Sequence, residues 1–158
     1  MWEAADAGEA AVVKRLIAAG AKVDLAGTRV GRGLSRNHQP LARAVEGKHV
    51  EVMELLLKAG ADPAVTDNGG DRPIDLAVEI RWAEGVRRLL ETGKREAYGP
   101  RYVNRETPLH QAMERCDEQL PALVEAFAAG APEMLNEKTA DGQSPLGFAK
   151  KWASKNIP

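Results

Sequence analysis

Several features that are common in proteins are scarce in this chain, and each scarcity narrows the possible structures. The 158 residues include one cysteine, Cys116, so no disulfide can form within the chain. Aromatic residues make up 4% of the sequence, which favours thin, closely packed helices over a thick aromatic core. No apolar run reaches the roughly 18 residues that a membrane-spanning helix needs. The composition is that of a globular chain without membrane spans.

Neither sign of charge dominates. The chain has 22 lysines and arginines against 23 aspartates and glutamates, a net charge of −1 at pH 7. No global basic field would draw it onto nucleic acid. The first residues include Glu3 and Asp6 and lack the basic-then-apolar pattern of a secretory signal. We therefore expect a cytoplasmic protein that binds neither membranes nor nucleic acid.

A short pattern, Pro-Leu/Ile-x-x-Ala, occurs four times. It begins at Pro40, Pro73, Pro108 and Pro145, at spacings of 33, 35 and 37 residues. Repetition at this length is typical of solenoid proteins. Each copy predicts a short helix, because proline is favoured in a first helical turn. The apolar stripes that follow have helical spacing, so the pattern predicts helix pairs.

The predicted helices are short and most end near a glycine. The expected intervals are 2–7, 10–19, a pair each in 40–60, 73–93 and 108–130, and a last helix at 145–154. Gly20 should end its helix in a left-handed conformation, and Pro121 should open the second helix of its pair. Gly85 occupies a position where an apolar residue is expected. By helix propensity alone it weakens its helix by about 1 kcal/mol relative to alanine.

These units resemble the ankyrin repeat. The residues that carry the resemblance are the best-kept copy, Thr107 to Ala112, the three other proline-led copies, and the endings Gly20-Ala21, Gly60-Ala61-Asp62 and Gly130-Ala131. The resemblance implies an α-rich repeat solenoid, in which stacked helix-turn-helix units are joined by β-hairpin or loop fingers. It implies one domain over residues 1–158, with units at about 1–24, 35–66, 67–99 and 102–136 and a partial unit at 139–158. Residues 67–71 (Asp-Asn-Gly-Gly-Asp) are expected to form one finger tip.

The copies differ where the family forms hydrogen bonds between turns. Only the copy that begins at Pro108 has both the threonine before the proline, Thr107, and the histidine two residues after it, His110. The residues that replace this pair in the other copies are Gln39 and Ala42, Arg72 and Asp75, and Ser144 and Gly147. We expect weaker coupling around the loop before Pro40, and an irregular finger after Gly93-Lys94-Arg95.

The resemblance also implies where a partner would bind, because ankyrin arrays generally use the finger tips and the concave face of the first helices. The positions expected on that face are Asp6, Glu46, Glu79 and Glu114, followed by Lys151 beside Trp152. The simple alternative is that glutamate favours any solvated helix surface. We expect a functional acidic stripe, with Trp152 as an additional partner contact or as a cap over the core, as for Trp2.

Two loops rich in arginine are the second candidate for partner contact. Residues 25–39 and 94–106 are long, and arginine and tyrosine are enriched at interface hot spots. The candidate contacts are Arg29, Arg32, Arg36, Arg95, Tyr98, Arg101 and Tyr102. The alternative is a solvated loop without a partner. Residues 27–33 lack the Gly-Lys-Ser/Thr ending of a phosphate-binding loop, so that interpretation is rejected.

No catalytic, metal or cofactor site is predicted. His38, His49 and His110 lie in different units without ligand-like spacing. His110 is expected to form structural hydrogen bonds, and Cys116 to be a small packing residue. The sequence predicts a non-catalytic scaffold, monomeric alone, that binds a folded protein. The resemblance to small bacterial ankyrin proteins favours an immunity or inhibitor protein acting on a toxin or enzyme; a targeting or assembly module excised from a larger protein is the alternative, and an enzyme is a remote one.

Overall fold

The computed structural model describes residues 1–25, 27, 39–101, 104–114 and 117–156, with side chains up to residue 150. The chain divides into two compact units, Met1–Leu76 and Ala77–Pro158, and each is described by itself. The boundary falls within the helix α5 (Pro73–Glu79), which begins at the second motif proline. One domain over residues 1–158 therefore stays a prediction.

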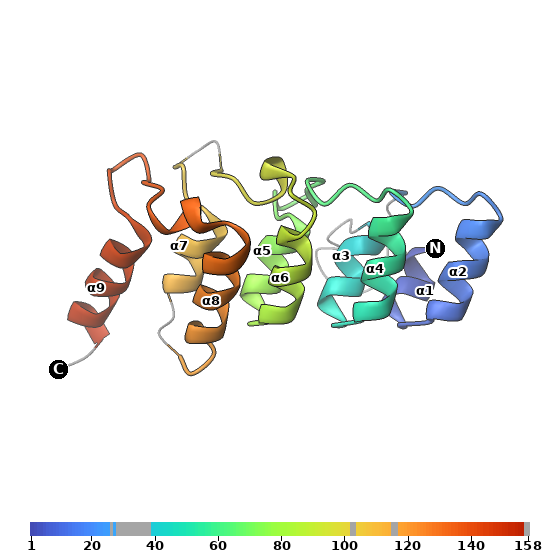
Figure 1. Cartoon of the computed structure of the whole chain (residues 1–158), viewed down its shortest axis with the longest axis horizontal. Helices are drawn as coiled ribbons and strands as arrows, with labels where there is room; N and C mark the ends of the chain where they lie inside the picture. The colour runs from blue at the N-terminus through green and yellow to red at the C-terminus, as the bar shows by residue number, and fades with distance from the viewer. Residues whose placement is uncertain (26, 28–38, 102–103, 115–116, 157–158) are drawn as a thin grey trace. The chain divides into compact units, whose positions relative to one another are not determined.

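The first unit contains two complete helix pairs (Figure 1). The first pair is α1 (Trp2–Asp6) and α2 (Ala10–Ala18), and the second is α3 (Pro40–Glu46) and α4 (Val50–Lys58). The shorter helices α1 and α3 pack against each other, and so do α2 and α4. Their shared core consists of Ala5, Val13, Leu41, Val45, Val52, Met53 and Leu56, all nearly fully buried. One helix pair could not bury these apolar residues alone, which is why helix pairs stack within the unit.

The second unit repeats this arrangement after the end of α5 (Figure 1). Its further elements are α6 (Ala83–Leu90), η1 (Arg95–Ala97), α7 (Pro108–Met113), α8 (Leu120–Gly130), η2 (Pro132–Leu135) and α9 (Pro145–Asn156). The helix α8 packs on α6 and α7, and α9 packs on α7. Leu89, Leu109, Leu123, Phe127 and Met134 are fully buried here. The predicted helix pairs are thus confirmed, with boundaries that differ by a few residues.

The turn inside three of the pairs has one shape, which sequence reasoning did not predict. Gly8, Lys48 and Arg81 occupy the same place and have φ values of 72°, 56° and 55°. In each turn this residue donates its N–H three residues back, to Ala5, Val45 and Val78 respectively. The left-handed conformation is unfavourable for lysine and arginine. The fold imposes it, because the second helix must return along the first.

The glycines near the helix ends have two different roles. Gly20 and Gly60 follow α2 and α4 in the left-handed region, with φ of 79° and 91°, as predicted for Gly20. Gly130 differs, because it is the last residue of α8 and a side chain there would collide with Leu90 of α6. Its requirement is the close approach of two helices.

Gly85 also serves packing. A Cβ atom at Gly85 would overlap the indole of Trp82, the residue that precedes α6. The glycine therefore provides the space in which the Trp82 ring lies over the first turn of α6. The missing apolar side chain at position 85 is supplied by Trp82.

We expect Gly85→Ala to destabilise the second unit, although alanine is the better helix former by about 1 kcal/mol. The added methyl group has to displace a bulky ring, and overpacking of this kind costs about 1–3 kcal/mol. Urea unfolding would give the change in stability, and tryptophan fluorescence would report the moved ring. A control is Ala129→Gly, an exposed position in α8, which should lose only helix propensity. A stabilised Gly85→Ala protein would contradict the packing role.

The fingers between helix pairs contain turns, and no β-strand occurs among the described residues. In the finger at 67–71, Asp67 N donates to Asp71 O at 2.9 Å and Gly70 N donates to Asp67 O at 3.1 Å. The finger at 139–143 has the same two bonds, from Thr139 N to Gln143 O and from Gly142 N to Thr139 O. The hairpin-like tip at 67–71 is therefore confirmed, but as a turn between irregular segments.

Candidate protein-binding surface

The four predicted acidic residues share one structural position. Asp6, Glu46 and Glu79 are the last residues of α1, α3 and α5, and Glu114 is the C-cap of α7. The C-terminal end of a helix carries a partial negative charge, so an acid there is unfavourable by about 0.3–1 kcal/mol. Helix stability alone would place acids at the opposite end. The helix dipole therefore does not account for the position of these four residues.

In the first unit, two of these acids converge on an arginine. Arg43, three residues before Glu46 on α3, lies 3.1 Å from the Glu46 carboxylate and 3.9 Å from Asp6 of α1. Its guanidinium also lies over the ring of Trp2, 6.0 Å from the centroid, which is within cation–π range. The acidic surface of this unit is thus partly neutralised from within. Sequence reasoning missed Arg43, although an Arg–Glu pair three residues apart on a helix was a readable signal.

His49 joins the two helix pairs of the first unit. Its Nε2 lies 3.2 Å from the backbone oxygen of Asp6, at the end of α1. A side chain at Gly8 or Gly47 would collide with its imidazole ring, so the ring occupies a space that both glycines leave open. This histidine anchors the end of α1, and with it the position of Asp6.

Trp2 is half-buried, and its indole packs on the backbone of Gly27. Gly27 belongs to the first arginine-rich loop, and it is buried. The contact agrees with the expected role of Trp2 as a cover over the core. Arg29, Arg32 and Arg36 of the same loop lie outside the described residues, so their contact with a partner stays a prediction.

In the second unit, Glu79 and Glu114 are exposed, and a different arginine follows Glu79 by two residues. Arg81, just after α5, donates from Nη1 to the backbone oxygen of Ala112 in α7 at 2.9 Å. Its Nε lies 3.1 Å from the carboxylate of Asp117. Arg81 therefore links the end of α5 to α7 and to Asp117. Neither Arg81 nor Asp117 was predicted, because their pairing joins positions 36 residues apart.

The second arginine-rich loop is tied to the finger that follows it. Arg95 donates to Glu133 at 3.1 Å, and it also forms an ion pair with Glu137. All three side chains are at least partly exposed, so solvent screens these pairs. The arrangement leaves Arg95 at the surface, but a partner would have to compete with two carboxylates for it.

The other predicted contacts of this loop differ in exposure. Arg101 is half-buried, and its backbone N–H donates to the backbone oxygen of Glu106 at 2.8 Å. Tyr98 is only 6% exposed, so its ring is part of the core and we remove it from the candidate surface. A tyrosine in an arginine-rich loop is read as an interface residue from sequence, but here it fills space beside Ala97. Tyr102 lies outside the described residues.

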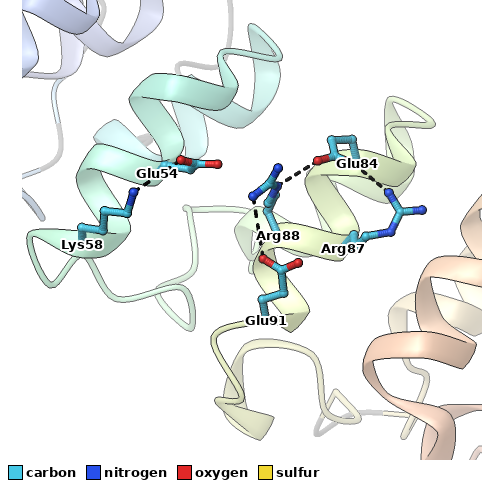
Figure 2. Close-up of polar contacts among 6 residues, drawn as sticks. All are labelled: Glu54, Lys58, Glu84, Arg87, Arg88 and Glu91. Atoms are coloured by element: carbon cyan, nitrogen blue, oxygen red, sulfur yellow. Dashed lines mark hydrogen bonds and ion pairs between the residues drawn. The ribbon is translucent and has the colours of Figure 1, made fainter.

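A charged cluster on α6 was not predicted (Figure 2). Glu84 accepts from Arg87 at 2.6 Å and from Arg88 at 2.8 Å, and Arg88 is 4.0 Å from Glu91. The hydrogen bond from Arg88 holds the pKa of Glu84 below its usual value, assisted by Arg87. In the first unit, Lys58 and Glu54 of α4 form a similar pair at 3.5 Å. These are i,i+3 and i,i+4 contacts that support the longer helices.

The best-kept motif is part of the scaffold, as predicted. His110 is fully buried, and its Nδ1 accepts from the backbone N–H of Thr107 at 3.2 Å. Its Nε2 therefore carries the proton and donates to the backbone oxygen of Gln143 at 3.1 Å. The ring also meets Phe148 of α9 edge-on, at 5.1 Å. Burial lowers the pKa of His110, which keeps the ring neutral.

A salt bridge replaces this pair in the copy that begins at Pro73. Asp75 accepts from the backbone N–H of Arg72 at 3.0 Å, as His110 does from Thr107. Its two oxygens also accept from Arg72 Nε at 2.9 Å and Nη2 at 3.2 Å. The two side chains are 8% and 1% exposed. The departure from threonine and histidine is thus a paired substitution that keeps the helix start capped.

The remaining candidates add little. Lys151 and Trp152 belong to α9, but their side chains lie outside the described part of the structure. Within the described residues, no group of three or more histidines, cysteines or acids is placed to hold a metal ion. The same residues include no helix with the length and apolar content to cross a membrane.

Comparison with known proteins assigns the family. The family model described as ankyrin repeats (3 copies) matches residues 1–98. A curated protein, zinc finger CCCH domain-containing protein 56 of Arabidopsis thaliana, is 45% identical over 42 residues, which is 27% of this chain and 6% of that protein. The chain thus spans a small fraction of this relative's length. Ankyrin repeats generally mediate protein–protein interaction and are typically non-catalytic. With its repeated helix pairs and this match over most of its length, the chain belongs to the ankyrin repeat family.

Proposed function

We propose that this protein is a non-catalytic scaffold that recognises a folded protein. The contacts would be made by its fingers and by the C-terminal ends of the first helices of the pairs, α1, α3, α5 and α7. The observation that carries the proposal is the position of Asp6, Glu46, Glu79 and Glu114 at the C-terminal ends of these helices. Acids at that end oppose the helix dipole, so they weaken the fold slightly. Binding a partner is a reason for them to be there.

The proposed partner carries a basic surface. Glu79 and Glu114 are exposed, whereas Asp6 and Glu46 share Arg43. A partner arginine or lysine could therefore reach the carboxylates of Glu79 and Glu114 from solvent. Arg95 and Arg101, together with Arg29, Arg32 and Arg36, are proposed to contact acids at the edge of the same partner. The sharpest form of the proposal is a cytoplasmic immunity or inhibitor protein that covers a toxin or enzyme.

The test uses Glu79→Gln and Glu114→Gln, which remove charge and keep side-chain size. Because Glu114 opposes the dipole of α7, we expect Glu114→Gln to be more stable by about 0.3–1 kcal/mol. We also expect the affinity for the partner, captured from the source cell and identified by mass spectrometry, to fall and its salt dependence to decrease. Thermal unfolding and calorimetric titration measure the two effects.

Glu125→Gln is the matched control, because Glu125 is an exposed glutamate on α8, away from the helix ends. It should leave both stability and affinity close to those of the unmodified protein. Unchanged affinity in the Glu79 and Glu114 variants would remove the acidic surface from the proposal. The Arg95 loop would then be the next surface to test.

A second candidate is a targeting or assembly module of a larger protein. It is favoured by the Arabidopsis relative, in which the matching segment is a small part of a much longer chain. Sequencing the complete transcript decides between the two, since a module requires further coding sequence on at least one side. An enzyme is a remote alternative, because it needs a pocket that brings reactive groups together.

A further inference from the structure

We propose that Asn68 is a site of spontaneous covalent modification, in which the backbone nitrogen of Gly69 attacks the Asn68 side-chain amide, and that Asp67 slows this reaction in the folded protein. The proposal concerns the chemistry of the finger at 67–71 and does not rest on the proposed function. The chain has five asparagines, and Asn68 is the one that precedes a glycine. Glycine leaves its nitrogen sterically open and its backbone free to turn.

The finger places the reacting groups at the surface. Asn68 and Gly69 are both exposed, whereas Asp67 is 7% exposed. The turn is closed by the bonds from Asp67 N to Asp71 O and from Gly70 N to Asp67 O. Water therefore reaches the amide of Asn68 directly, while the backbone on either side of it is held.

Asp67 binds the attacking nitrogen. Its Oδ1 accepts from Gly69 N at 2.8 Å and from Asp71 N at 2.9 Å. A Cβ atom added at Gly69 would lie 3.2 Å from the same oxygen, so the carboxylate lies directly against this residue. One buried carboxylate oxygen thus fixes the N–H groups on both sides of Gly70.

The reaction balances with water as its only co-reactant. A bond forms between Gly69 N and Asn68 Cγ, the bond from Cγ to Nδ2 breaks, and the proton from Gly69 N leaves with Nδ2 as ammonia. The product is a five-membered cyclic imide. Water then adds to one of its two carbonyl carbons and returns a proton to the nitrogen. Opening at Cγ leaves aspartate at position 68, and opening at the backbone carbon leaves isoaspartate.

Ring closure requires Gly69 N to turn toward the Asn68 side chain. That rotation breaks the 2.8 Å bond to Asp67 and the turn that this bond supports. Hydrogen bonds to charged groups are stronger than those to neutral ones. Loss of the Asp67 carboxylate should therefore speed the reaction by about tenfold.

The modification would change the finger permanently. Either product adds a negative charge between Asp67 and Asp71, and isoaspartate also lengthens the backbone by one carbon. The bonds that close the turn depend on the original backbone spacing. The finger should therefore lose its present turn, with a change in surface charge as the protein ages.

The experiment follows the full chain during incubation at mildly alkaline pH. The tryptic peptide 59–81 contains Asn68 as its only asparagine, so mass spectrometry assigns the change to one residue. Isoaspartyl methyltransferase labels the isoaspartate product. The expected order of rates is Asp67→Ala fastest, Asp67→Asn intermediate and the unmodified protein slowest. Asn keeps an acceptor oxygen at position 67 but without the charge.

Two results would overturn the proposal. The first is a urea-unfolded chain in which Asn68 changes no faster than Asn104 or Asn136, since the site would then have no special reactivity. The second is an Asp67→Asn protein, folded by circular dichroism, that reacts no faster than the unmodified protein. Asp67→Asn provides the test if Asp67→Ala does not fold. Gly69→Ala should slow the reaction in both folded and unfolded chains, because its methyl group shields the nitrogen.

Discussion

Replacing Asp75 with alanine is expected to destabilise the protein by about 3–5 kcal/mol. The substitution removes the carboxylate that faces the nearly buried guanidinium of Arg72 through two hydrogen bonds. It also removes the acceptor of the Arg72 backbone N–H at the start of α5. Breaking a buried pair from one side is costly because the other charge stays in a low-dielectric environment. Urea unfolding measures the loss.

Two further variants separate the parts of this effect. Asp75→Asn keeps an oxygen for the Arg72 backbone N–H and should lose less stability than Asp75→Ala. The double variant Arg72→Thr with Asp75→His rebuilds the pair that Thr107 and His110 form in the copy at Pro108. It should recover most of the loss, because no charge is then buried. A double variant as unstable as Asp75→Ala would contradict the equivalence of the two pairs.

Replacing His110 with alanine is expected to destabilise the second unit by about 2–4 kcal/mol. The Thr107 backbone N–H loses its acceptor, the Gln143 oxygen loses its donor, and a cavity forms beside Phe148. His110→Asn should lose less, since its amide oxygen can still accept from Thr107. Repeat arrays can unfold one repeat at a time. Hydrogen exchange should therefore show the loss of protection around α7 and α9.

The same histidine predicts a pH dependence. Burial lowers the pKa of His110 below its ordinary value, so the unfolded chain takes up a proton before the folded protein does. Stability should therefore be unaffected above the unfolded pKa of about 6.5 and should fall as the pH drops below it. The fall continues to the lowered pKa of the folded state. A pH series of urea unfolding would show this slope, and the slope should be missing in His110→Asn.

The local pattern of the sequence was sufficient to predict the helix pairs of the scaffold. The motif prolines and the apolar stripes predicted the helix pairs, because each of these signals acts within one or two helical turns. It also predicted the structural role of His110 and the turn at 67–71. The β-hairpin alternative for the fingers could not be decided in this way, since short fingers form turns or strands according to their pairing in space.

The contacts of the candidate surface were decided by the tertiary structure. Arg43 meets Asp6 from a different helix pair, and Arg95 meets Glu133 and Glu137 across 38 and 42 residues. Such ion pairs depend on which side chains the stacked helix pairs bring together. The local periodicity of the sequence does not encode these contacts. Gly85 shows the same limit, because propensity marks it as a defect whereas the Trp82 ring requires it. The sequence determined that helix pairs stack, whereas the tertiary structure decided which charges neutralise one another, because ion pairs between residues far apart in the sequence form only after the core has packed.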